Sequence, residues 1–136
     1  EYLASAFVDM ALHEKAEIGE IDVPAFEREV MARIGMPAEI IPRHRALHFG
    51  HIFAGEGYSA GYYSYLWSEV LDADAFRAFE ETGDVFDAGV AKRLKDKIFA
   101  AGGSQDPADA YRAFRGRVPE VDALLAKRGL EAPVEA

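Results

Sequence analysis

The chain has 136 residues, a length that suits one domain, and half of them are hydrophobic, which is enough to form a core. A net charge of −9 argues against a nucleic-acid partner, because phosphate backbones bind basic surfaces. The absence of cysteine excludes disulfides, thiol catalysis and zinc–thiolate sites, and it fits a cytoplasmic protein. No apolar run reaches about 18 residues and no signal-peptide pattern appears, so we expect no membrane partner.

The first predicted helix covers residues 2–15. Its apolar residues recur at helical spacing: Leu3, Phe7, Met10 and Ala11. Near its end, His13-Glu14 matches the opening of the H-E-x-x-H zinc-protease pattern, in which two histidines one turn apart hold zinc. The pattern fails because Glu17 stands where the second histidine is needed. We therefore interpret the pair as a polar helix end.

A second helix is predicted to start at Asp22, a typical N-cap with Pro24 close behind it, and to stop at Gly35. One side of this helix is apolar: Phe26, Val30 and Ile34. Residues 37–41 fit a short turn or helix. Residues 42–51 fit a connection, which carries two arginines and three histidines.

A third helix is predicted to start near Tyr58 and to run to about Glu81, where Thr82-Gly83 ends it. Its apolar stripe includes Leu66, Val70 and Phe76, joined by Trp67 and Phe79. Residues 87–101 predict a fourth helix, with glycines behind it and one apolar face: Val90, Leu94 and Ile98.

Two further helices complete the predicted fold. One starts at Asp106-Pro107, again an N-cap followed by proline, and ends at Gly116. The other covers residues 121–128 and is closed by Gly129 at a typical C′ position, after which we expect the tail beyond Leu130 to fray. No strand alternation or internal repeat is present, so the sequence predicts an all-α fold of about six helices with short loops.

Residues 51–67, HIFAGEGYSAGYYSYLW, hold four tyrosines and three glycines behind a histidine. If the helix opens at Tyr58, then Tyr58, Tyr62 and Tyr65 share one face, while Tyr63 turns toward the apolar stripe. One interpretation is that all four rings belong to the core. The other is a polar groove, in which a phenol donates to a carbonyl oxygen that becomes negative during acyl transfer. The glycines that would keep this face open are Gly55, Gly57 and Gly61.

Three histidines, His44, His48 and His51, follow one another at spacings of four and three. On a helix they could converge into a tris-histidine zinc site. A proline and two arginines among them favour a loop, and the arginines repel a dication. We therefore favour a single His51 that donates a hydrogen bond to a ligand, and we expect no metal site in this chain.

Arginine guanidinium groups match the geometry of a carboxylate and so are candidates for gripping one. The alternatives for these arginines are surface solubility and internal salt bridges. The candidates are Arg43, Arg45, Arg115 and Arg117.

Several spaced motifs together resemble one family. In order they are HFGHIFAGEGYSAGYYSYLWSEVLDADAF, AGGSQDPADAYRAFRGR and LLAKRGL, with a weaker likeness in EYLASAFVDMALHE. This series resembles the C-terminal end of the thimet-oligopeptidase family of zinc peptidases, most closely its bacterial peptidyl-dipeptidase (dipeptidyl carboxypeptidase) branch.

The resemblance implies a larger, mostly helical enzyme with two lobes around a deep channel. Zinc would be held there by an H-E-x-x-H helix and a later glutamate, both upstream of Glu1. Residues 1–136 would then be a C-terminal segment of the peptidase catalytic domain that lacks the zinc-binding helix. The start at Glu1 instead of methionine agrees with a piece of a longer chain.

The resemblance also implies roles for individual residues. Tyr58 and Tyr65 match family tyrosines that bind substrate and stabilise the oxyanion, and they are the expected catalytic residues. His51 matches a histidine that contacts substrate near the scissile bond, and Tyr62 matches another channel tyrosine. The glycine-rich stretch matches a loop over the site. The expected substrate-binding set is His51, Gly55, Gly57, Tyr58, Tyr62 and Tyr65.

The implied function is zinc-dependent hydrolysis of short peptides by the intact parent, as a peptidyl-dipeptidase or oligopeptidase. We expect this segment alone to be inactive. Its partners would be short peptide substrates and the missing N-terminal part of the enzyme, whose docking face could also drive self-association of the segment. The alternative is a non-enzymatic helical module for peptide binding or interaction.

Overall fold

A computed structural model of the chain describes residues 2–16 and 19–130. Within these residues all regular structure is helical, with six α-helices and no strand, which confirms the predicted all-α class. The chain divides into two compact units between Trp67 and Ser68, inside helix α3 (Tyr63–Glu80). The sequence shows no linker at this point because the boundary lies within a continuous helix.

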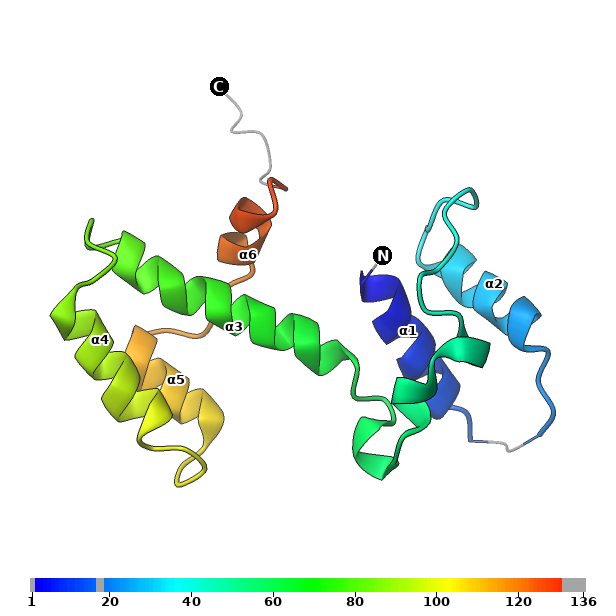
Figure 1. The fold of residues 1–136 in the computed structure, drawn as a ribbon, viewed down its shortest axis with the longest axis horizontal. Coiled ribbons are helices and arrows are strands. Elements are labelled where there is room, and N and C mark those ends of the chain that lie inside the picture. Colours follow the sequence, from blue (N-terminus) through cyan, green and yellow to red (C-terminus); the bar gives the residue numbers. More distant parts are fainter. Residues whose placement is uncertain (1, 17–18, 131–136) are drawn as a thin grey trace. The chain divides into compact units, whose positions relative to one another are not determined.

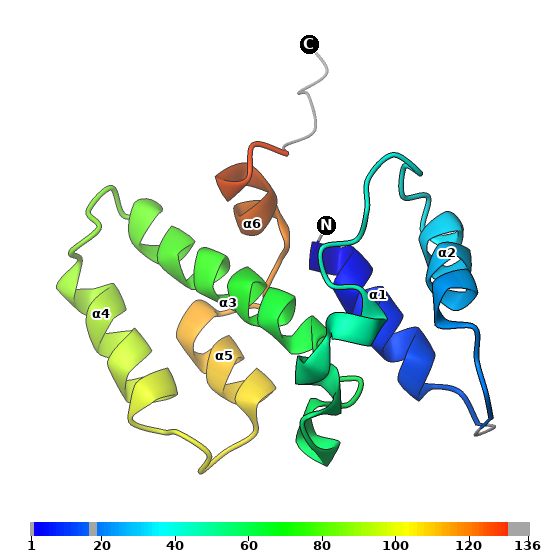
Figure 2. The same cartoon turned by 45° about the vertical axis from the view of Figure 1, so that its right-hand side comes forward.

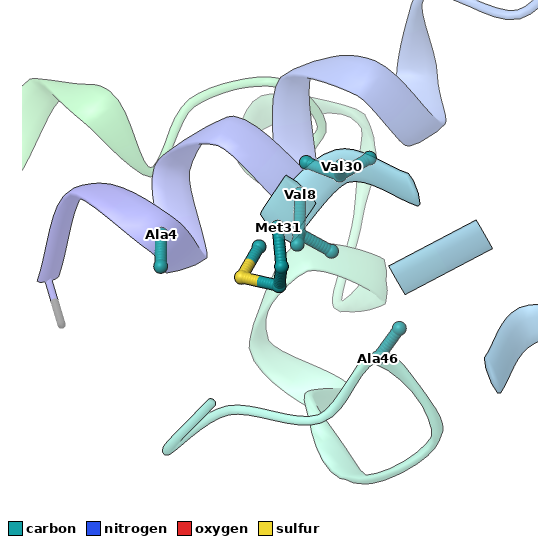
Figure 3. Close-up of a cluster of buried hydrophobic side chains, with 5 residues drawn as sticks. All are labelled: Ala4, Val8, Val30, Met31 and Ala46. Carbon is teal, nitrogen blue, oxygen red and sulfur yellow. The ribbon is translucent and has the colours of Figure 1, made fainter. Parts of the chain in front are cut away.

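The first unit is built on two helices that pack against each other, α1 (Tyr2–His13) and α2 (Val23–Arg33) (Figure 1). A cluster of buried apolar side chains from both helices and from the segment after them fills the space between (Figure 3). Its members are Ala4, Val8, Val30, Met31 and Ala46.

The predicted helix α1 is present, but it does not bury the apolar residues that suggested it. Leu3 and Phe7 are exposed, at 53% and 45% of their surface. The buried side carries two polar residues instead, Ser5 and Asp9, which are 2% and 1% exposed. Apolar spacing identified the helix but not its packed side, because buried polar residues that find hydrogen-bond partners are invisible to hydrophobic periodicity.

Helix α2 begins and ends as predicted. The side chain of Asp22 accepts a hydrogen bond from the N–H of Ala25 at 3.0 Å, as an N-cap should. At the other end Gly35 adopts φ 69°, and the N–H of Met36 bonds back to the carbonyl of Met31 at 3.0 Å. This is the Schellman arrangement that glycine favours after a helix.

Residues 46–58, which follow α2 in the chain and are drawn in teal to green in Figure 2, form three short 3₁₀ helices: η1 (Ala46–His48), η2 (Gly50–Phe53) and η3 (Glu56–Tyr58). The prediction of a helix from Tyr58 is therefore wrong, because α3 begins at Tyr63. Two residues break the helical path. Gly55 has φ 153° and ψ 166°, and Ala60 has φ 55°.

The second unit contains the rest of α3 and three further helices, α4 (Ala88–Leu94), α5 (Pro107–Arg115) and α6 (Asp122–Lys127). Helix α4 continues as a π-helical turn, η4 (Lys95–Phe99), so the helix predicted over residues 87–101 is confirmed with a change of pitch. The core of this unit joins α3, α4 and α5 through Ala78, Val90, Tyr111 and Phe114.

The predicted stripe on α3 is only partly buried. Val70 is 6% exposed and Phe79 packs on the core, whereas Trp67 and Phe76 are 53% and 52% exposed. The predicted ends of the last helices are correct: Asp106 caps α5, and Gly116 and Gly129 follow α5 and α6 with φ 80° and 66°. The expected fraying beyond Leu130 falls on residues 131–136, which lie outside the described residues.

A buried charge network lies on α3 and α5. Asp74, fully buried, accepts hydrogen bonds from the Tyr111 hydroxyl at 2.6 Å and from Arg117 at 2.5 Å, and it pairs with Arg115 at 3.3 Å. Arg115 also makes two 2.7 Å bonds to the carboxylate of Glu81. These two arginines therefore serve internal salt bridges, and the hypothesis that they grip a ligand carboxylate is wrong.

The environment of this network shifts the pKa values of its members. Burial raises the pKa of Asp74, but hydrogen bonds from Tyr111, Arg115 and Arg117 outweigh burial and hold that pKa below its usual value. Burial and the bond to Asp74 raise the pKa of Tyr111, so its hydroxyl stays a donor.

Among the described residues, no helix is long and apolar enough to cross a bilayer.

Candidate functional site

Four side chains from the tyrosine-rich stretch meet in the first unit, and we call them the tyrosine cluster: His51, Tyr58, Tyr62 and Tyr65. The His51 ring lies against all three tyrosines, with centroid separations of 4.9 Å to Tyr58 and 5.7 Å to both Tyr62 and Tyr65. Tyr62 and Tyr65 are themselves 5.3 Å apart. The residues predicted for the site are thus together, although they do not share one helix face: His51 is on η2, Tyr58 on η3 and Tyr65 on α3.

The tyrosines of this stretch are mostly not core residues. Tyr58, Tyr63 and Tyr65 are 46%, 54% and 45% exposed, so the interpretation that all four rings belong to the core is wrong. Tyr62 alone among the four is half-buried. The Tyr65 hydroxyl shares a 3.1 Å hydrogen bond with Nε2 of His51. This bond gives the exposed phenol a fixed orientation and leaves one side of it open.

A shallow hollow of about 400 Å³ runs beside the cluster. Tyr2 stacks on Tyr62 at 5.3 Å, and His44 stacks on Phe49 at 4.6 Å while meeting the edge of Tyr62. The lining is aromatic and imidazole-rich, without a carboxylate: Tyr2, His44, His48, Phe49, Gly50, His51, Tyr62 and Tyr65. Flat rings with polar tips suit a groove that holds a peptide.

The three histidines line the same hollow, but they do not come together as metal ligands. Nδ1 of His44 bonds to the Ser5 hydroxyl at 3.0 Å, and His51 bonds to Tyr65. Within residues 2–16 and 19–130, no group of three histidine, cysteine, aspartate or glutamate side chains is placed to hold a metal ion.

The glycines of the stretch differ in what they require. Gly55 adopts φ 153° and ψ 166°, a conformation almost restricted to glycine. A methyl group on Gly61 would lie 3.3 Å from the carbonyl oxygen of Tyr58, so the backbone passes close there. Gly57 has open space and an ordinary backbone. Gly55 and Gly61 therefore shape the loop that carries Tyr58, whereas Gly57 leaves its surface uncovered.

A buried carboxylate that sequence patterns did not single out holds the end of this loop. Asp9, on α1, accepts hydrogen bonds from the backbone N–H of Ala60 at 3.0 Å and of Tyr62 at 2.9 Å. Nδ1 of His13 donates a third, at 2.8 Å. His13 is thus more than a polar helix end. The available signal was an aspartate between two apolar neighbours, Val8 and Met10, four residues before a histidine.

A second buried carboxylate holds the start of the same loop. Glu27, on α2 and 3% exposed, accepts a 2.5 Å hydrogen bond from the N–H of Ala46 and a 2.6 Å bond from Arg45. Arg45 is therefore engaged internally and is not a grip for a ligand carboxylate. The fourth candidate, Arg43, is exposed.

Comparison with known proteins places this arrangement in a family. The family model described as "Peptidase family M3" matches residues 2–130. This match confirms the resemblance found in the sequence motifs.

The relatives are named peptidases. The chain is 40% identical to "Dipeptidyl carboxypeptidase" of Salmonella typhimurium over 96% of its own length and 19% of that protein. It is 43% identical to "Probable cytosolic oligopeptidase A" of Arabidopsis thaliana over the same shares. It is 54% identical to "Oligopeptidase A" of Haemophilus influenzae over 63% of its length and 12% of that protein. The chain thus spans less than a fifth of the length of these relatives.

Proposed function

Because the chain belongs to peptidase family M3, we propose that it forms part of an enzyme that hydrolyses short peptides, and that the tyrosine cluster holds the substrate beside the scissile bond. The observation that carries this proposal is the meeting of two exposed phenols, Tyr58 and Tyr65, around one imidazole, His51. A packed core would have buried these hydroxyls.

Tyr65 and Tyr58 are the proposed oxyanion donors. With the proton on Nε2, His51 donates to the Tyr65 oxygen, and the Tyr65 O–H is then free to donate to the substrate carbonyl oxygen as that oxygen becomes negative. Tyr58 meets the same imidazole edge-on at 4.9 Å and offers a second donor. Donors held in place before the reaction stabilise the transition state more than the bound substrate.

The remaining proposed site residues bind the peptide. Tyr62 supplies a flat, half-buried wall that contacts both His51 and Tyr65. Gly55 and Gly57 expose backbone beside Tyr58, which lets an extended peptide approach the loop closely.

Zinc is the metal that we propose for the whole protein, on the strength of the family resemblance. Such a metal would activate the attacking water. The residues described in this chain do not fit the metal, because no three of them form a ligand group. We therefore propose that the ligands lie upstream of Glu1, in a part of the peptidase domain that segment 1–136 lacks, and that the segment alone is inactive.

That upstream part is also the proposed partner of exposed apolar side chains in each of the two units. Phe86, Phe99 and Ile41 are 87%, 73% and 72% exposed, far more than large apolar residues usually are on a finished surface. We further propose release of C-terminal dipeptides, which the name of one of the three relatives suggests and the other two names leave open.

Substitution of Tyr65 by phenylalanine in the whole protein tests the proposed function. Loss of one oxyanion donor should lower kcat about 100- to 1000-fold, with a much smaller change in KM, because the hydroxyl acts mainly in the transition state. Tyr63→Phe is the matched control, since Tyr63 is as exposed but makes no ring contact with His51 among those found. Equal kcat for Tyr65→Phe and Tyr63→Phe would contradict the proposal. Mass spectrometry of the products of a blocked hexapeptide would identify dipeptide release.

A further inference from the structure

We propose that Asp9 is a positioning residue of the candidate site: its buried carboxylate holds the segment from Ala60 to Tyr62 and thereby fixes where the Tyr65 hydroxyl lies. This inference rests on the proposed function, because it assigns Asp9 an effect on catalysis through Tyr65. Asp9 itself is buried beneath the loop and touches none of the reacting atoms.

Both carboxylate oxygens of Asp9 bind the backbone of the loop. Oδ1 accepts from the N–H of Ala60 at 3.0 Å and from Nδ1 of His13 at 2.8 Å, and Oδ2 accepts from the N–H of Tyr62 at 2.9 Å. A carboxylate can only accept, so Nδ1 of His13 carries a proton. His13 lies on the same helix as Asp9, whereas Ala60 and Tyr62 follow Asp9 by 51 and 53 residues in the chain.

Burial makes these bonds hard to break. Asp9 is 1% exposed, and a buried carboxylate is stable only while its oxygens are paired. His13 is the sole side chain found to bond to it among the described residues, so the backbone of Ala60 and Tyr62 supplies the rest of its partners. Moving the loop away would leave the carboxylate unpaired in the interior.

The held segment is bent against its own preference. Ala60, at φ 55°, is the one residue other than glycine with positive φ in the described ranges. The next residue passes so close to the preceding turn that a methyl group on Gly61 would meet the Tyr58 carbonyl oxygen at 3.3 Å. Strained backbone persists where surrounding contacts fix it, and here the contact is Asp9.

The position of Tyr62 determines where the proposed donor, Tyr65, lies. The ring of Tyr62 contacts Tyr65 at 5.3 Å and His51 at 5.7 Å. The carbonyl of Tyr62 accepts the N–H of Tyr65 at 3.4 Å, in the first turn of α3. A shift of Tyr62 would therefore displace the Tyr65 hydroxyl from its bond with His51, and misplacement by about 1 Å can cost of the order of 100-fold in rate.

A double-mutant cycle of Asp9→Asn and Tyr65→Phe in the whole protein tests this role. Asparagine keeps the shape but turns one acceptor into a donor that faces a backbone N–H. We expect Asp9→Asn to lower kcat by about 10- to 100-fold with a smaller change in KM, on a blocked tetrapeptide. Tyr65→Phe should then cost much less in the Asp9→Asn background than alone, since the hydroxyl is already misplaced.

Asp74→Asn is the matched control, because Asp74 is equally buried but belongs to the second unit. At a temperature well below the unfolding midpoint of the Asp74→Asn variant, the effects of Asp74→Asn and Tyr65→Phe on kcat should be additive. Additive behaviour of Asp9→Asn, or the same coupling for Asp74→Asn, would overturn the proposal.

Hydrogen exchange separates failure of this inference from failure of the proposed function. In Asp9→Asn, peptides that cover residues 58–64 should exchange faster, while those from α5 should not change. If Tyr65→Phe leaves kcat unaltered, the proposed function fails, and the exchange result alone decides whether Asp9 holds the segment. Unchanged hydrogen exchange in Asp9→Asn would show that Asp9 does not hold the segment.

A milder variant covers the case in which Asp9→Asn does not fold. His13→Gln removes the imidazole donor but keeps the carboxylate, and the His13 side chain is 20% exposed. It should give the same changes in exchange and coupling at smaller size. Normal exchange together with additivity in this variant would overturn the proposal.

Discussion

The two units each bury an aspartate almost completely, and the two aspartates are paired in opposite ways. Asp74 in the second unit binds charged and phenolic side chains, Arg115, Arg117 and Tyr111. Asp9 in the first unit binds backbone N–H groups of a loop and one histidine. Because its partners are side chains, Asp74 joins helix α3 to helix α5. Because its partners are mainly backbone N–H groups, Asp9 fixes the path of the loop from Ala60 to Tyr62.

The two units also differ in how many polar groups they leave available for a ligand. Arg115 and Arg117 of the second unit bind carboxylates of that unit, so they leave little charge for a ligand. The first unit instead presents phenols and an imidazole whose hydrogen-bonding capacity is only partly used. This difference supports our proposal that the functional site lies in the first unit.

The largest expected effect comes from replacing Asp74, the buried aspartate of the second unit. Asp74→Ala should lower the free energy of unfolding by about 3–5 kcal/mol, because Arg115, whose side chain is 7% exposed, loses a buried partner. The control is Asp72→Ala, where a carboxylate 73% exposed pairs with Lys127, and the expected loss is below about 1 kcal/mol. Urea denaturation measures both. Similar losses would show that burial does not distinguish the two pairs.

Acid should reproduce part of that loss. The folded-state pKa of Asp74 lies below its unfolded value, so its contribution is complete above the unfolded pKa of about 3.9 and is lost as pH falls through the folded pKa. Glu81, whose pKa is lowered by its bonds from Arg115, acts in the same direction. Unfolding midpoints from neutral pH downwards should fall more steeply for the wild type than for Asp74→Asn. Parallel curves would contradict this assignment.

The smallest effect concerns the glycines of the first unit. Gly55→Ala should cost about 1–3 kcal/mol, because alanine is strained at φ 153°, although a methyl group there meets no atom. Gly57→Ala should stay within about 0.5 kcal/mol. Thermal unfolding compares the pair. Equal costs would mean that the loop relaxes around Gly55 and is less fixed than the Asp9 contacts indicate.

The fold was largely predictable because helix ends carry local chemistry. Asp22, Asp106 and Gly116 each act through atoms within four residues, so the sequence alone identifies them. The start of α3 was not predictable. It depends on contacts between Asp9 and Ala60, which are 51 residues apart and leave no periodic signal.

The site shows the same division. Tyr58, Tyr62 and Tyr65 were expected together on a helix face, and they do meet, but through three separate turns. Their composition was visible in the sequence, whereas the bonds that hold their loop were not, because those bonds run from carboxylates to backbone groups that every residue except proline possesses.

That last property of the Asp9 contacts bears on how such a loop can evolve. An anchor that binds N–H groups recognises the path of the chain and not the side chains along it. The Asp9 contacts by themselves therefore limit positions 60 and 62 only through the backbone: neither can become proline, and position 60 must tolerate a positive φ. The Tyr62 ring is constrained separately, by its contacts with His51 and Tyr65. The side chain at position 60 can thus change while the Asp9 contacts still hold the path of the loop.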